Sequence, residues 1–176
     1  SKAAARFIGN RKQEAWHDET LWMVRVKRDK MSHSLPEWER LRELGCEIKL
    51  YSNSHLDVLL EEFEKNATAN GAIVHWAKDA AEHNAIVEEI LQQHKAHTLI
   101  KSKSMLTEEC GMNDYLFGKG YDIIESDLGE RILQWMKLHP SHIVMPAIHI
   151  KRQEVGEMME RVLGTEKGNS DPTYLT

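Results

Sequence analysis

The chain has 176 residues and a mass of 20.3 kDa, enough for one compact domain with a small addition and too little for two full-sized domains. Charged residues make up 29% of it, and its longest uncharged apolar run, residues 143–148, is about as long as a strand, which excludes a transmembrane helix. A net charge of −5 argues against a nucleic acid or an anionic membrane surface as the main partner, because such surfaces require a basic excess.

The sequence has two cysteines, Cys46 and Cys110, and they form no C-x-x-C pattern. This chain alone therefore cannot supply a disulfide framework, a zinc knuckle or an iron–sulfur site. Its ten histidines show no H-E-x-x-H spacing, so we expect no dedicated metal site and no cofactor in this chain. A reducing, cytoplasmic setting is the expectation that follows.

Residues 1–70 are predicted to form a helical N-terminal region. A mixed apolar and charged pattern indicates a first helix over residues 4–30. Ser34 and Pro36 are typical of a helix start, and apolar residues then recur at steps of three or four from Trp38 to Tyr51. Another helix is expected from residue 54 until Asn70 and Gly71, a pair that tolerates the left-handed conformation and ends helices.

After Gly71 the pattern predicts alternating strands and helices. Strands are expected at residues 72–77, 98–102, 122–125 and 142–145, and helices at residues 79–95, 107–117, 128–138 and 151–163. Such repeated βα units of 20 to 26 residues are typical of an α/β fold with a parallel sheet. The α/β domain is thus assigned to residues 71–163, and the polar residues 164–176 are interpreted as a linker-like tail.

Ligands of open parallel sheets bind beyond the carboxyl ends of the strands, so the βα turns are the places to search. The turn after the second strand is unusual, because its two ammonium groups and three hydroxyls precede a helix N-terminus that also favours an anion. A phosphate, a carboxylate or an acidic cofactor edge would suit the predicted ligands Lys101, Ser102, Lys103, Ser104 and Thr107. The alternative is a solvated turn in which Ser104 or Thr107 only caps the helix.

Two further turns carry candidate residues. Asp127 and Glu130 follow the third strand and could take part in substrate binding, or could form a capping box at the next helix. His149 follows Pro146 at the fourth strand and could transfer protons near neutral pH, or could be an ordinary hydrogen-bonded histidine. Neither a P-loop nor a G-x-G-x-x-G motif is present.

With these turns in view, the sequence resembles the lactate utilisation protein B family, whose N-terminal portion is the LUD domain. Residues 101–109, 124–130 and 140–149 carry the resemblance, and they occur in the order and spacing of the family. The leading residues 5–11 also look like the start of family members.

The resemblance implies a fold like that of the NagB/RpiA/CoA-transferase group and a part in an iron–sulfur complex that oxidises L-lactate to pyruvate. The implied partners are other lactate-utilisation subunits and a small anionic substrate. Family members continue into a second half of the LUD domain and a ferredoxin-like segment that holds four-iron clusters. We therefore expect that this chain is truncated and that it would not turn over lactate by itself.

Three functions remain open at this stage. The first is a subunit of the electron-transferring complex, with an anion held by the turn after the second strand. The second is a non-catalytic docking scaffold that uses the tryptophan-rich helical region. The third is a sugar-phosphate or CoA-ester enzyme, which rests on fold analogy alone.

Overall fold

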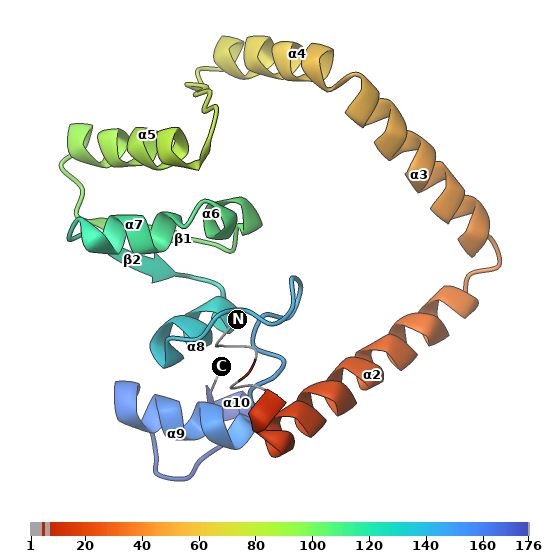
Figure 1. Cartoon of the computed structure of the whole chain (residues 1–176), viewed down its shortest axis with the longest axis vertical. Coiled ribbons are helices and arrows are strands. Elements are labelled where there is room, and N and C mark those ends of the chain that lie inside the picture. The colour runs from red at the N-terminus through yellow and green to blue at the C-terminus, as the bar shows by residue number, and fades with distance from the viewer. Residues whose placement is uncertain (1–4, 6–7, 176) are drawn as a thin grey trace. The chain divides into compact units, whose positions relative to one another are not determined.

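The computed structural model describes residue 5 and residues 8–175. Residue 4, at which the first predicted helix begins, and Arg6 and Phe7 of the leading segment lie outside the described residues. The elements in chain order (Figure 1) are α2 (Arg11–His33), α3 (Trp38–Ser54), α4 (Leu56–Ala69), α5 (Ala80–Gln93), β1 (Thr98–Lys101), α6 (Met105–Glu109), α7 (Met112–Gly118), β2 (Asp122–Glu125), α8 (Leu128–Met136), α9 (Arg152–Leu163) and α10 (Pro172–Leu175).

The chain divides into two compact units. One contains residues up to 20 together with those from 77 onward, and we call it the α/β unit. The other consists of residues 21–76, and we call it the helical unit. The first ten residues of α2 thus belong to the α/β unit and the rest of α2 to the helical unit.

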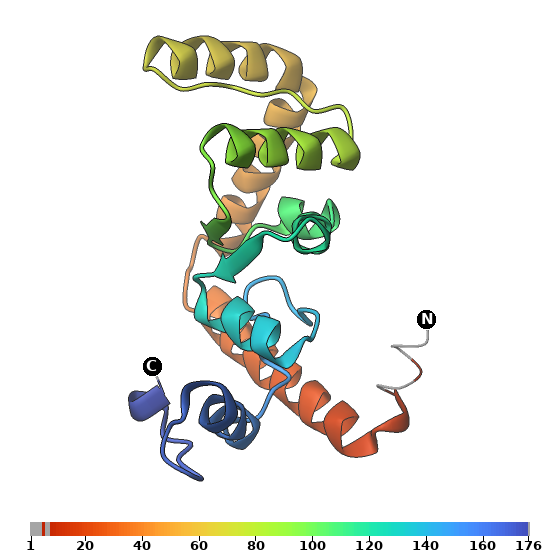
Figure 2. The same ribbon diagram turned by 90° about the vertical axis from the view of Figure 1, so that its left-hand side faces the viewer.

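The α/β unit is built around β1 and β2, which run parallel with Thr98 opposite Asp122 and Lys101 opposite Glu125 (Figure 2). These two predicted strands are confirmed, and so is the α/β class in its coarse form. A parallel pair needs a crossover connection, which α6 and α7 provide. Both carboxyl ends therefore lie at the same edge.

Two apolar clusters form the core of the α/β unit. In the first, α5, α7 and β2 bring together Leu91, Met112, Leu116 and Ile123. In the second, α8 and α9 bring together Ile132, Met158 and Met159. Buried side chains of this kind each contribute about 1.5–3 kcal/mol, which keeps the helices in place around the strand ends.

The helix predicted at residues 107–117 is divided into α6 and α7 at Cys110 and Gly111. Gly111 has φ +60° and ψ +30°, a left-handed conformation that glycine adopts without strain. The carbonyl of Cys110, which the break leaves without a helical partner, accepts a hydrogen bond of 2.8 Å from the Asn84 side chain. The break turns α7 to a direction of its own.

The strand predicted at residues 72–77 is wrong. These residues form no strand, and Ile73 is 83% exposed. A strand requires a neighbouring ladder to satisfy its backbone groups, and the described residues provide none here. The segment is held instead by a hydrogen bond of 2.9 Å from Trp76 Nε1 to Glu64 of α4.

The strand predicted at residues 142–145 is also wrong, because this segment folds on itself. Nδ1 of His142 accepts hydrogen bonds of 3.1 Å from the backbone N–H groups of Val144 and Met145. The Ser141 N–H donates to the carbonyl of Pro146 at 3.1 Å, which closes the turn. A local side-chain acceptor has replaced the ladder that the apolar run suggested.

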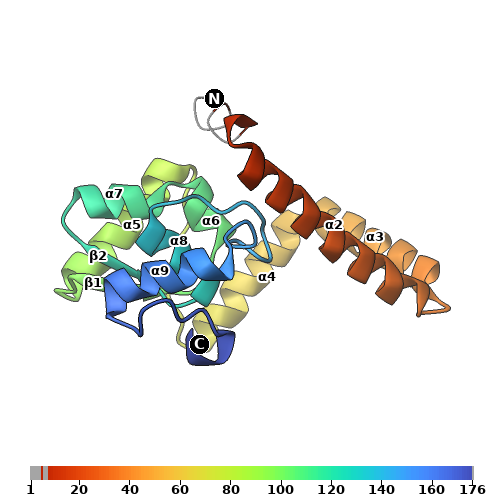
Figure 3. The ribbon, with the colours of Figure 1, turned by 90° about the horizontal axis from the view of Figure 1, so that it is seen from below.

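The tail interpreted as a linker packs against α9 (Figure 3). A Cβ atom added to Gly156 of α9 would lie 2.5 Å from the carbonyl oxygen of Asn169, so the tail approaches the helix as closely as glycine allows. Leu175 of α10 joins the second apolar cluster.

The helical unit contains the rest of α2 together with α3 and α4. Neither α3 nor α4 buries a residue. The predicted apolar face of α3 is thus present but exposed: Leu41, Leu44, Ile48 and Tyr51 are between 46% and 60% exposed.

Candidate functional site

The carboxyl ends of β1 and β2 carry a buried ion pair. Lys101 and Glu125 are the last residues of the two strands, and Lys101 Nζ lies 2.6 Å from Glu125 Oε1. The Asn113 side chain of α7 donates a second hydrogen bond of 2.8 Å to the same oxygen. Both charged side chains are largely withdrawn from water, being 10% and 3% exposed. The Lys101 ammonium is therefore neutralised within the protein.

A second, looser pair lies beside the first. Lys103 Nζ lies 3.8 Å from Glu130 Oε1, which is too long for a hydrogen bond, and both atoms are buried without a hydrogen-bond partner. Glu125 Oε2 and Asn113 Oδ1 are also buried and unpartnered. Buried polar atoms nearly always have partners, because leaving one unpaired costs about 1–3 kcal/mol. Four such atoms gather at this place in the fold, and a bound molecule or an ordered water would supply the partners that they lack.

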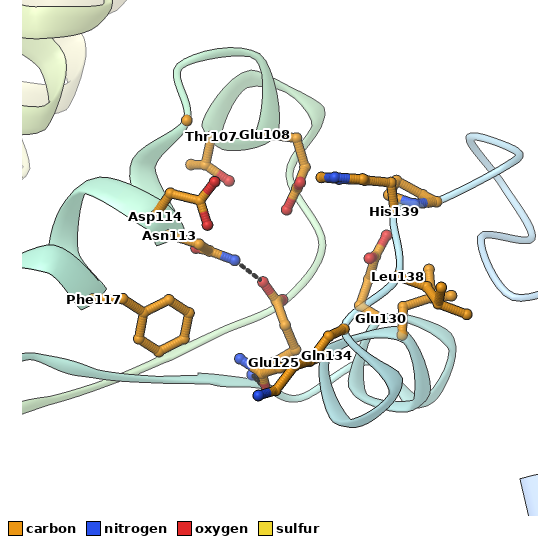
Figure 4. A pocket seen from close by; sticks show the side chains of 14 residues that line it. Thr107, Glu108, Asn113, Asp114, Phe117, Glu125, Glu130, Gln134, Leu138 and His139 are labelled. Carbon is orange, nitrogen blue, oxygen red and sulfur yellow. Dashed lines mark hydrogen bonds between the residues drawn. The ribbon is translucent and has the colours of Figure 1, made fainter. Parts of the chain in front are cut away.

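Asn113, Glu125 and Glu130 line a cavity of about 550 Å³ between α6, α7 and α8 (Figure 4). Lys101 and Lys103 are not lining residues, but each lies against a carboxylate that is, Glu125 and Glu130 respectively. Its volume lies within the range of about 300–1,000 Å³ that small-molecule sites occupy. Figure 4 shows the carboxylates of Glu108, Glu125 and Glu130 directed into this space. The cavity is lined by Thr107, Glu108, Gly111, Asn113, Asp114, Phe117, Glu125, Glu130, Leu133, Gln134, Lys137, Leu138, His139 and Pro140.

The cavity raises the pKa of Glu130 above its ordinary value of 4.5. The main cause is burial, which disfavours the charged form, and the nearby charge of Glu108 adds to it. The Lys103 ammonium acts in the opposite direction. Glu130 is thus the carboxyl group of this site that holds a proton more readily than it would in water.

Of the residues singled out from the sequence, Thr107 and Glu130 line the cavity, and Lys101 and Lys103 pair with its carboxylates Glu125 and Glu130. Lys101 faces Glu125, the last residue of β2, and Lys103 faces Glu130 in the first turn of α8. A pairing of this kind cannot be predicted from turn composition alone, because it depends on how the two strands are aligned.

The remaining turn residues have local roles. Ser104 Oγ accepts the Thr107 N–H at 3.4 Å and caps α6, and Asp127 Oδ1 accepts the Glu130 N–H at 3.2 Å and caps α8. The capping alternative is therefore present at α6. At α8 the described contacts include only the Asp127 half of the expected capping box, because the Glu130 carboxylate is directed into the cavity. Ser102, which lies between β1 and α6, is exposed.

His149 lies in a different cluster and does not line the cavity. It is buried, and its ring meets that of His17 of α2 edge to face, with 6.3 Å between the centroids. Burial, and to a smaller extent the electrostatic effect of the neighbouring His17, lower the pKa of His149 below its ordinary value of 6.5, while the Pro146 backbone and Glu154 oppose the shift. Nearby, Lys151 Nζ lies 5.3 Å from the centroid of the Trp16 ring.

Glu125, Asn113 and Glu108 were not selected as site residues from the sequence. Glu125 could have been found, since it ends a predicted strand and directly precedes a turn rich in carboxylates. Asn113 and Glu108 could not, because the break at Gly111 decides which way α6 and α7 point.

No group of three or more His, Cys, Asp or Glu residues placed to hold a metal ion occurs within residues 5 and 8–175. The four-iron clusters that the resemblance implies do not fit these residues either, because such a cluster takes four thiolates and the sequence has two cysteines. Along the described chain, no helix has the length and apolar character that crossing a membrane requires.

Comparisons with known proteins confirm the resemblance. Lactate utilization protein B 1 of Bacillus mycoides (strain KBAB4) is 40% identical over 154 residues, which are 86% of this chain and 32% of that protein. Lactate utilization protein B of Bacillus pumilus (strain SAFR-032) is 42% identical over 137 residues, which are 77% of this chain and 29% of that protein. The chain spans about a third of the length of these curated relatives.

No solved structure is significantly similar to the chain. The sequence profile of the LUD domain matches residues 60–171, which include all of the cavity and its buried ion pairs. This match covers more than half of the sequence. The chain belongs to the LUD domain family.

Proposed function

We propose that this chain takes part in lactate utilisation and that its cavity binds the carboxylic acid of that process, L-lactate or its oxidation product pyruvate. The names of the similar proteins support the process. The volume and position of the cavity, at the carboxyl ends of two parallel strands, support a small ligand.

The observation that carries the proposal is the buried ammonium of Lys103, which has no hydrogen-bond partner and lies next to Glu130, a lining residue of the cavity. A carboxylate placed against it would gain charge-assisted hydrogen bonds that the Lys103–Glu130 distance of 3.8 Å leaves unformed. Since the cavity is rich in carboxylates, the ligand's negative charge would be tolerated best when Glu130 is protonated. Lys103 thus binds the ligand carboxylate, and Glu130 holds the compensating proton.

In the wider process, we propose a subunit of a cytoplasmic complex that oxidises L-lactate to pyruvate with electron transfer, on a NagB/RpiA-like fold. Its partners would be other lactate-utilisation subunits. Four-iron clusters, which do not fit the two cysteines of this sequence, would be held outside residues 1–176 by a ferredoxin-like part.

Titration calorimetry of the chain with L-lactate and with pyruvate tests the ligand assignment. We expect saturable binding of at least one of them, weakened about tenfold or more in Lys103→Met because a charged hydrogen-bond partner is lost. The matched control is Lys167→Met, an exposed lysine of the tail, which should bind as the unchanged chain does. Absence of binding, or equal binding by Lys103→Met, would contradict the assignment.

The exposed apolar face of α3 favours a second candidate function, that of a docking scaffold for the other subunits. Apolar side chains at helical spacing suit contact with a partner helix. The double variant Leu44→Glu/Ile48→Glu changes two exposed residues and should abolish co-purification with co-expressed lactate-utilisation subunits, whereas Glu43→Gln should not. Retained co-purification of the double variant would rule out this face.

A further inference from the structure

The four unpartnered atoms around the cavity differ in their hydrogen-bonding chemistry. Glu125 Oε2, Asn113 Oδ1 and Glu130 Oε1 are oxygens, whereas Lys103 Nζ is the one nitrogen among the four. The Glu125 carboxylate and the Asn113 amide oxygen can only accept hydrogen bonds, whereas Glu130, which holds a proton in the proposed complex, can also donate one. A ligand that satisfies this set must bring a hydrogen-bond donor of its own, in addition to the carboxylate that faces Lys103.

Glu125 is the acceptor whose orientation is best determined. Lys101 Nζ and Asn113 Nδ2 both donate to its Oε1, at 2.6 Å and 2.8 Å, which leaves Oε2 as the oxygen without a partner. Its backbone is also held, because the Gln134 side chain of α8 donates to the Ile123 carbonyl at 2.6 Å and accepts the Glu125 N–H at 3.4 Å. The oxygen is thus fixed before any ligand arrives.

Resting on the proposed function, we infer that the site distinguishes a 2-hydroxy acid from a 2-oxo acid and that Glu125 is the specificity-determining residue. The hydroxyl of L-lactate donates a hydrogen bond to Glu125 Oε2 while the ligand carboxylate meets Lys103. The keto oxygen of pyruvate carries no hydrogen, so it cannot donate to Glu125 and its lone pairs would repel those of the Glu125 carboxylate. A site built to receive a hydroxyl rejects the analogue that lacks it, because its own buried group stays unpaired.

The experiment is titration calorimetry of the chain with L-lactate, pyruvate and propionate, which has neither a hydroxyl nor a keto group. We expect L-lactate to bind about tenfold or more tightly than pyruvate, with propionate weaker than L-lactate and no weaker than pyruvate. This order needs no variant, so it tests the inference even if substitutions at Glu125 unfold the chain.

In Glu125→Gln an amide replaces the acceptor, and the ratio of lactate to pyruvate affinity should fall toward one. The matched control Glu109→Gln removes an exposed carboxylate that does not line the cavity and should keep the ratio. Equal affinity for L-lactate and pyruvate would overturn the specificity and leave the proposed function intact. Failure of all three acids to bind would overturn both.

Discussion

Lys101 and Glu125 end two parallel strands, stand opposite each other in the register, and form a buried ion pair of 2.6 Å. Glu125 lines the cavity, and its pairing neutralises the Lys101 ammonium, so Lys101 has no charge left for a ligand. A ligand anion is met instead by Lys103, whose carboxylate partner is farther away and has a raised pKa.

Replacing Lys101 alone should strongly destabilise the α/β unit. Lys101→Met leaves the Glu125 carboxylate buried with Asn113 as its hydrogen-bond donor, and an uncompensated buried charge costs about 3–5 kcal/mol. The double variant Lys101→Met/Glu125→Leu removes both charges and should recover most of the loss. Urea denaturation of both variants measures this, and an equal loss in both would show that the ion pair is not the cause.

Binding of a carboxylate ligand should strengthen as the pH falls through the raised pKa of Glu130. Protonation removes the negative charge beside Lys103 and leaves the ammonium for the ligand, so binding should take up a proton. Calorimetry in two buffers of different ionisation enthalpy measures that uptake. In Glu130→Gln the uptake should disappear, and its persistence would assign the proton to another group.

The same carboxyl group affects folding. Because the folded pKa of Glu130 is raised above 4.5, the folded state binds the proton more tightly than the unfolded chain does. Its contribution to stability is therefore fully present below pH 4.5 and is lost as the pH rises through the folded pKa.

His149 should make the chain less stable in acid. Its pKa is lowered below 6.5 in the folded state, so its contribution is present above pH 6.5 and is lost as the pH falls through the folded pKa. Thermal unfolding between pH 7.5 and 5 should show a smaller loss of stability in His149→Gln than in the unchanged chain. His94→Gln, an exposed histidine after α5, serves as control and should behave as the unchanged chain.

Two glycines of one region should respond in opposite ways to the same substitution. Gly111→Ala introduces a side chain at φ +60° and should cost about 1–2 kcal/mol, because the left-handed region is strained for alanine. Gly118→Ala lies at the end of α7, has no positive φ and would meet no atom within 4 Å, so it should be neutral or stabilising by up to about 1 kcal/mol. Chemical denaturation compares the two. Equal effects would mean that the backbone at Gly111 is not what separates α6 from α7.

Local patterns were enough to predict most of the helices. The helices that begin at Trp38 and at Ala80 follow from their periodicity and their flanking residues. At the start of α5, the Asp79 side chain accepts a hydrogen bond from the Glu82 N–H and caps the helix. The strands were predictable only where a partner exists. Residues 98–101 and 122–125 pair in a parallel ladder. Residues 72–77 and 142–145 have comparable apolar runs, but they pair with no strand among the described residues.

By itself the sequence determined the α/β class, the positions of the turns that carry charge, and the resemblance to the LUD domain, because these depend on residues close together in the chain. Only the tertiary structure decided that Lys101 faces Glu125, that Lys103 faces Glu130 without a hydrogen bond, and that His149 lies apart from both. Lys101 and Glu125 are 24 positions apart in the sequence, Lys103 and Glu130 are 27 positions apart, and His149 contacts His17 from the other end of the chain. Such contacts follow from strand register and helix packing, which no local pattern encodes.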